Sequence, residues 1–127
     1  MQHEFTALTV LVGDEERQIS VHQEMMQDAA PILDSMDADM AQGWQLGREF
    51  VTSPDTIQRC QIAANRLLTA LHTSNDASAS LMAAYILSRM TEVHTVVINA
   101  EGESEETMFY DHNQALITKP ANNNNEG

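Results

Sequence analysis

The chain has 127 residues and a formal net charge of −13, and 43% of its residues are apolar. This length and apolar content suffice for one folded domain with a buried core, and they exclude wholesale disorder. An excess of 19 acidic over 6 basic residues repels phosphate backbones and anionic lipid surfaces, so we expect neither nucleic-acid binding nor membrane binding. The charge suits a basic protein partner or bound cations; the alternative is that it serves only solubility.

The cysteine content and the apolar runs indicate the compartment. A single cysteine, Cys60, excludes an intramolecular disulfide and favours a reducing compartment. The longest apolar run in the body, residues 81–87, is far shorter than the roughly 20 residues of a membrane-spanning helix, and the N-terminus lacks the basic start of a signal peptide. We therefore expect a cytoplasmic protein with one domain over residues 1–117 and a disordered, asparagine-rich tail over 118–127.

The first part of the chain predicts a β-hairpin followed by helix. Residues 5–12 are rich in β-branched residues and alternate as a strand does, and a polar turn leads to a second short strand around 19–21. From residue 23 the apolar residues recur every three to four positions. This period predicts a helical region over about 23–51, bent or broken near Pro31.

Two glycines, Gly43 and Gly47, flank the only tryptophan, Trp44. Each glycine costs about 1 kcal/mol against alanine inside a helix. That cost indicates either the close approach of another backbone or a helix end between Met40 and Phe50.

The second part of the chain predicts two further helices and a second pair of strands. Residues 53–55 combine an N-cap, a proline for the first helical turn and an acid, and helical apolar spacing continues to about residue 72. A helix over about 77–92 and strands over about 94–100 and 105–111 follow. This order favours an α+β fold, in which both hairpins form one antiparallel sheet, about three to four helices pack on one face, and the outer surface is polar.

The methionines of the first helical region allow three interpretations. A stripe of methionines is typical of a helix core, because methionine fills irregular gaps. The second interpretation is an adaptable interface, in which Met36, Met40 and Trp44 contact a partner.

The third interpretation is a soft-metal site. His22 and Met26 are four residues apart, as are Met36 and Met40, and thioethers together with an imidazole bind Cu(I). No motif for an organic cofactor is present, and we expect none.

Two groups of acidic residues offer weaker signals. Asp34 and Asp37 share a helix face, but their spacing lacks the glycine and the terminal glutamate of a calcium loop. The glutamates of residues 101–106 crowd the turn between the last two strands. A cation or a basic partner would relieve their repulsion, and a solvated acidic turn is the alternative.

No catalytic signature is present, and we assign no catalytic residue. The chain has no phosphate-binding glycine loop, nucleophile elbow or paired-cysteine motif. Cys60 falls on the apolar face of a predicted helix, which favours a buried structural thiol. An enzyme whose residues meet only in space, with Cys60, His72 or His94 as candidates, is one alternative.

The lead hypothesis is a non-enzymatic protein-interaction domain, accessory or regulatory to a larger partner. Its contacts would come from the Met36, Met40 and Trp44 segment and from the acidic surface. A homodimer is a second mode of association, because an exposed apolar helix face also pairs with itself. The soft-metal protein is the runner-up to this hypothesis.

Overall fold

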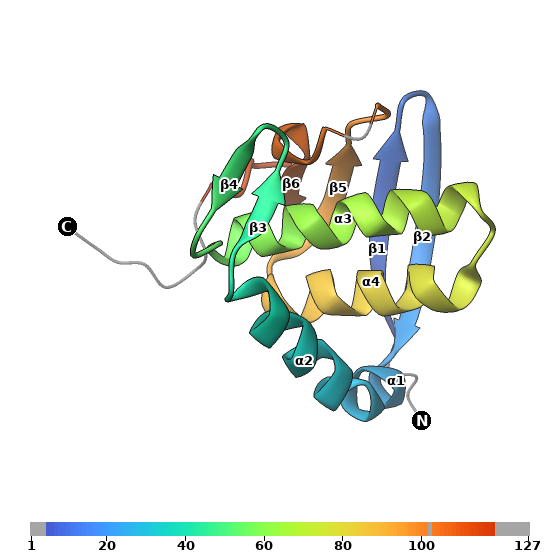
Figure 1. Ribbon diagram of the computed structural model, residues 1–127. Helices are drawn as coiled ribbons and strands as arrows, with labels where there is room; N and C mark the ends of the chain where they lie inside the picture. Colours follow the sequence, from blue (N-terminus) through green and yellow to red (C-terminus); the bar gives the residue numbers. More distant parts are fainter. Residues whose placement is uncertain (1–4, 102, 119–127) are drawn as a thin grey trace.

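A computed structural model describes residues 5–101 and 103–118. Within these residues the chain forms a mixed sheet, a separate short hairpin and a layer of helices (Figure 1). The strands are β1 (Phe5–Val12), β2 (Glu15–His22), β3 (Trp44–Leu46), β4 (Glu49–Val51), β5 (Val93–Ile98) and β6 (Met108–Asp111). The helices are α1 (Gln23–Asp28), α2 (Ala30–Met40), α3 (Thr56–His72), α4 (Asp76–Arg89) and the 3-10 helix η1 (Ser104–Glu106). The predicted α+β class is confirmed, and the predicted tail lies outside the described residues except for Thr118.

The main sheet has the strand order β2-β1-β5-β6 over the described residues. β1 with β2 and β5 with β6 are antiparallel neighbours, as the sequence predicts. β1 and β5 join the two pairs side by side, with Val10 opposite Val96. This junction is parallel, which differs from the expected antiparallel pairing. The reason is that the helices return the chain to the end of the sheet where β1 begins, so β5 starts there too (Figure 1).

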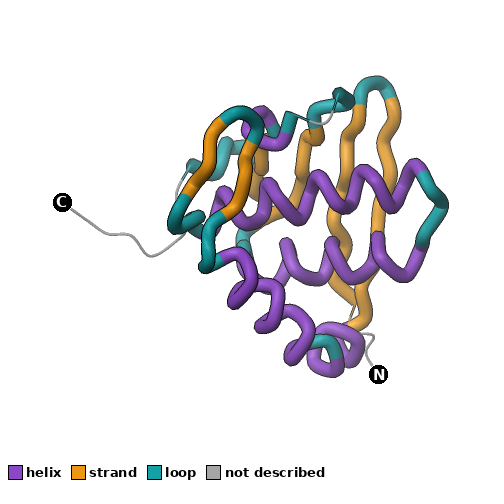
Figure 2. The backbone as a smooth tube through the Cα atoms, in the orientation of Figure 1, coloured by secondary structure: helices purple, strands orange, loops and turns teal. Residues whose placement is uncertain are grey.

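The helices cover one face of the main sheet, and the core lies between the two layers (Figure 2). Side chains alternate along a strand, and Leu8, Val10, Val96 and Phe109 point to the helices and are buried. α3 and α4 lie antiparallel across them, and Tyr85 of α4 is fully buried. No helix of the part that the structure describes is long and apolar enough to cross a bilayer.

Side chains close the N-termini of the two long helices. Asp55 accepts a hydrogen bond from the backbone N–H of Gln58 at 2.8 Å, and the Gln58 side chain accepts one from the N–H of Asp55 at 2.9 Å. This capping box starts α3 two residues after Ser53. Asn75 caps α4 by accepting from the N–H of Ser78 at 3.1 Å. Both predicted helices are therefore confirmed, with shifted ends.

The predicted helix over residues 41–51 is wrong, because this segment forms the β3–β4 hairpin. α2 ends at Met40, and Gly43 then takes a φ of +106°, which a helix does not allow. Gly47, with a φ of +63°, begins the two-residue turn between Leu46 and Glu49. The two glycines that flank Trp44 thus mark the end of the helix and the hairpin turn.

Replacing Gly43 with alanine is expected to lower the free energy of unfolding by about 2–3 kcal/mol. The added Cβ would sit in an unfavourable backbone conformation, 2.5 Å from Cζ of Phe50 and 3.3 Å from the Val51 carbonyl oxygen. Gly13→Ala is the matched control, because Gly13 also has a positive φ but no atom within 4 Å of the added Cβ. It should cost about 1 kcal/mol. Equal losses in urea unfolding would contradict the additional cost expected at Gly43 from its φ of +106° and its contacts with the hairpin.

Candidate functional site

The face of the main sheet that points away from the helices carries an apolar surface. Leu11, Val97 and Met108 lie directly opposite one another on three adjacent strands. Tyr110 pairs with Leu116 through an isolated bridge, which extends this surface beyond β6. We call it the open sheet face; its apolar members are Phe5, Ala7, Leu11, Val97, Met108, Tyr110 and Leu116, and the buried Thr9 and Thr95 lie between them on β1 and β5. No described helix covers it (Figure 2).

The exposure of the open sheet face is unusual for apolar residues. Phe5, Met108 and Leu116 are 57%, 46% and 48% exposed, and they are three of the five large apolar side chains that are exposed among the described residues. The sequence predicts a polar outer surface, and the structure shows one that is partly apolar. Contiguous exposed apolar patches are typical of interaction sites.

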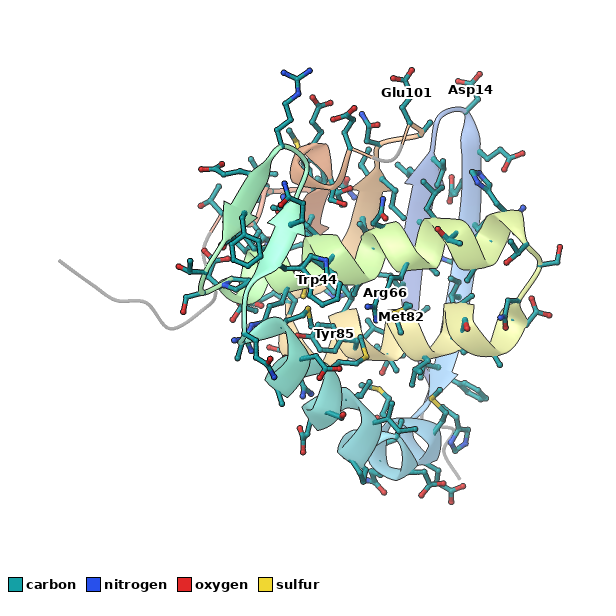
Figure 3. All side chains as sticks on the ribbon, in the orientation of Figure 1. Asp14, Trp44, Arg66, Met82, Tyr85 and Glu101 are labelled. Carbon is teal, nitrogen blue, oxygen red and sulfur yellow. The ribbon has the colours of Figure 1, made fainter. Side chains whose placement is uncertain are left out.

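Acidic residues border this face at the end of the sheet where β1 and β5 finish. β1 and β5 are parallel, and Val12 lies opposite Ile98, so the segments after both strands leave the sheet at the same edge. Asp14 and Glu101 accordingly stand beside each other there (Figure 3). We call this edge the acidic rim; among the described residues it comprises Asp14, Glu15, Glu16, Glu101, Glu103 and Glu106. Glu16 also pairs across the strands with Leu11, which brings the rim onto the open sheet face.

Asn99 fixes the conformation of the second half of the acidic rim. Its side-chain oxygen accepts the backbone N–H groups of Glu101 and Glu103 at 2.9 and 3.2 Å, and its amide donates to Glu106 at 3.0 Å. Asx turns of this kind order a loop locally. Asn99 therefore orders the backbone at Glu101 and Glu103 and holds the Glu106 carboxylate.

A groove on the other side of the molecule lies between α3 and α4. Its volume is about 300 Å³, its floor is apolar with Ala70 and Met82, and Thr69 and Thr73 line its wall. Arg66 stands in it, and its guanidinium carbon lies 5.1 Å from the centre of the Trp44 ring. Figure 3 shows both side chains on the outer side of the helical layer, with the sheet behind.

A polar network joins α2 to α3 and α4 around Asp37. Its carboxylate accepts two hydrogen bonds from Arg89, at 2.6 and 3.0 Å, one from Arg59 at 3.3 Å and a short one from the Tyr85 hydroxyl. Arg89 also contacts the exposed Asp34 at 3.0 Å. Burial alone would raise the pKa of Asp37, but the hydrogen bonds from Tyr85 and Arg89 outweigh it and lower the pKa.

The contacts of Asp37 connect three helices. The Asp37 carboxylate already accepts four hydrogen bonds from the arginine and tyrosine side chains, which occupy both of its oxygens. Burial, and then the hydrogen bond to Asp37, raise the pKa of Tyr85, so the phenol stays protonated and keeps donating. The network therefore holds α2 against the two long helices.

Cys60 is a buried core thiol, as the sequence predicts. It is 0% exposed, and burial raises its pKa to about 12. A thiol with this pKa holds almost no thiolate at neutral pH and is a poor nucleophile. His72 lies about 18 Å further along the α3 axis at 1.5 Å rise per residue, and these two candidates therefore do not share one site.

We expect Cys60 in the folded protein to resist aromatic disulfide reagents at pH 8. The same protein in denaturant should release one equivalent of chromophore, because the chain has a single cysteine. Absorbance over time gives both rates. Native labelling at the denatured rate would contradict the burial of this thiol and revive the nucleophile hypothesis.

The predicted interaction residues separate into core and surface. Met36 and Met40 are 9% and 2% exposed and belong to the core cluster. Trp44 is half-buried at the start of β3 and packs partly against that cluster. Only Trp44 of the three reaches the surface, where it contacts Arg66.

The predicted soft-metal ligands also lie in different settings. His22 is the N-cap of α1, its Nδ1 accepts from the N–H of Glu24 at 3.1 Å, and its ring meets Phe5 at 4.8 Å. Met26 lies on α1 and packs partly against the core. Met40 is the last residue of α2, about 15 Å along the helix axis from Ala30, the residue with which α2 begins. Among the described residues no group of three His, Cys, Asp or Glu side chains could hold a metal ion. The copper site stays a prediction.

The open sheet face and the α3–α4 groove were not predicted from the sequence. The only signal for the first was that β1 carries apolar residues at both odd and even positions, as Leu11 beside Val10 and Val12 shows. Such a strand suits burial on both faces, but its pattern does not say which face a helix covers.

No known protein family, curated protein or solved structure matches this chain.

Proposed function

We propose that this protein is a non-enzymatic interaction domain that docks a basic protein partner on its open sheet face. The observation that carries the proposal is the apolar row of Leu11, Val97 and Met108 next to the acidic rim. An apolar centre with a charged border is the usual composition of a protein-binding surface. We include in this proposal that the protein acts in a reducing, cytoplasmic compartment, as the single cysteine predicts.

The charge of the chain supports a basic partner over the alternatives. A net charge of −13 attracts a basic surface over long range and raises the rate of encounter. The same charge repels nucleic acid, and it repels a second copy of the chain. The apolar row then supplies affinity once the partner has been oriented by the rim.

A capture experiment with two matched variants tests the proposal. Met108→Asp places a charge in the apolar row, whereas Phe50→Asp places the same charge on the β3–β4 hairpin, where Phe50 is 56% exposed. Wild-type protein and Phe50→Asp should retain the same basic protein from native lysate, identified by mass spectrometry. Met108→Asp should lose it, with the affinity for the purified partner falling at least about tenfold, or about 1.4 kcal/mol.

Salt and oligomeric state complete the test. Partner binding should weaken at high salt, because the contacts at the acidic rim are screened. Equal capture by Met108→Asp and wild type would overturn the proposed face. A dimer of the protein alone in sedimentation, abolished by Met108→Asp, would show that a second copy occupies the face instead.

A further inference from the structure

Arg66 is an isolated cation in an acidic protein. Arg17, Arg59 and Arg89 each lie within 4.0 Å of a carboxylate. Among the described arginines, Arg48 in the β3–β4 turn and Arg66 make no such ion pair, although the chain has 19 acidic and only 6 basic residues. The Arg66 guanidinium lies over the Trp44 ring instead. Stacking of this kind leaves the in-plane N–H groups free for a carboxylate, which they match as a two-pronged donor.

Other groups in the α3–α4 groove complement a ligand held by Arg66. Thr73 donates its hydroxyl hydrogen to the Thr69 carbonyl at 2.9 Å, so its oxygen presents lone pairs to the groove. Asn75 uses its side-chain oxygen to cap α4 at 3.1 Å, which leaves its amide N–H groups to donate. The groove thus pairs one cation with neutral acceptors and donors, above the apolar floor of Ala70 and Met82.

Size and charge narrow the ligand class. A volume of about 300 Å³ stands at the lower end for small-molecule sites and therefore favours a small ligand. One arginine balances one negative charge, and the net charge of −13 penalises a phosphate dianion further. A hydroxyl or amino group on a small ligand would meet the Thr69 hydroxyl, one helical turn from Arg66. Thr73 lies about 10 Å from Arg66 along the α3 axis, so Thr73 and Asn75 would be reached only by a longer ligand such as a peptide.

We propose that the α3–α4 groove binds a small monocarboxylate bearing a hydroxyl or amino group, with Arg66 as the carboxylate ligand and Trp44 as its support. Two sources supply this chemistry, a free hydroxy acid or amino acid and the C-terminal carboxylate of a peptide. The groove lies on the helical side, opposite the open sheet face, so the two proposals stand independently.

Trp44 provides the readout, because it is the only tryptophan of the chain. Small hydroxy acids, amino acids and short peptides are each titrated to about 10 mM, which reveals even millimolar dissociation constants. The neutral amide of each compound serves as its control. We expect a carboxylate-dependent change in Trp44 fluorescence and a matching rise in melting temperature. A response to the free acids identifies a hydroxy acid or amino acid as the ligand, and a response to the peptides identifies a C-terminal carboxylate.

Two arginine variants decide the outcome. Arg66→Gln should weaken binding at least tenfold while its circular dichroism stays that of wild type, and Arg48→Gln, which removes the same charge from the β3–β4 turn, should bind normally. Met108→Asp should also bind normally, so failure of the docking face is distinguishable. The proposal is overturned if no carboxylate in the panel acts, if acid and amide act equally, or if Arg48→Gln loses as much as Arg66→Gln.

Discussion

Replacing Asp37 with asparagine is expected to lower the free energy of unfolding by about 2 kcal/mol at pH 7. The carboxylate is 28% exposed and receives hydrogen bonds from Arg59, Arg89 and Tyr85. An amide keeps one acceptor and loses the charge, so Arg59 and Arg89 lose the partly buried counter-ion that they share, and Arg89 keeps only the exposed Asp34. Removing one partner of such a pair costs more than the pair itself contributes, because the remaining charge is left desolvated.

Asp34→Asn is the matched control for this prediction. Asp34 lies on the same helix and contacts the same Arg89 at 3.0 Å, but its side chain is 77% exposed. Exposed ion pairs contribute about 0–1 kcal/mol, and we expect a loss below about 0.5 kcal/mol. Urea unfolding of the three proteins measures both values. Similar losses for Asp34 and Asp37 would show that the network adds nothing beyond a surface ion pair.

The acid dependence of stability should change in the Asp37 variant. The folded-state pKa of Asp37 is below its ordinary value, so its contribution is present above the unfolded pKa of about 3.9. The contribution is lost as the pH falls through the folded pKa, where both states bind the proton. The gap between wild type and Asp37→Asn should therefore be constant from pH 7 to about pH 5 and narrow below about pH 4. A gap that widens on acidification would have the wrong sign for a lowered pKa.

In the Asp37 network, one feature could be predicted from the sequence and another could not. That Asp34 and Asp37 share a helix face follows from their spacing of three. Their partner Arg89 is 52 positions from Asp37 and belongs to another helix. Nothing in the local pattern connects the two, because the contact exists only once α2 crosses α4. Local sequence patterns can locate each helix, but they do not predict which residues of distant helices will contact one another.

Local patterns fail in a different way at residues 41–51. Apolar residues at helical spacing continue through Trp44 and Phe50, yet two glycines with positive φ decide the conformation. Hydrophobic period is a property of several residues, whereas one backbone dihedral is enough to end a helix. The consequence reaches the surface, because the hairpin is what places Trp44 against Arg66 at the edge of the groove.

Truncation of two neighbouring residues of β6 should change the free energy of unfolding by very different amounts. Phe109 is 1% exposed and points into the core, whereas Met108 is 46% exposed on the open sheet face. Phe109→Ala should lower the free energy of unfolding by about 3–5 kcal/mol, because the lost side chain leaves a cavity between sheet and helices. Met108→Ala should change it by less than about 0.5 kcal/mol, as exposed substitutions do.

Urea unfolding and partner affinity, measured on both variants, separate the two faces of the main sheet. Met108→Ala, stable and folded, should bind the partner more weakly than wild type, since it removes part of the apolar row. Phe109→Ala should bind with unchanged affinity at temperatures where it is still folded, because its side chain faces the helices. A large stability loss in Met108→Ala would mean that another part of the chain covers this face, and the surface would then be core rather than a docking site.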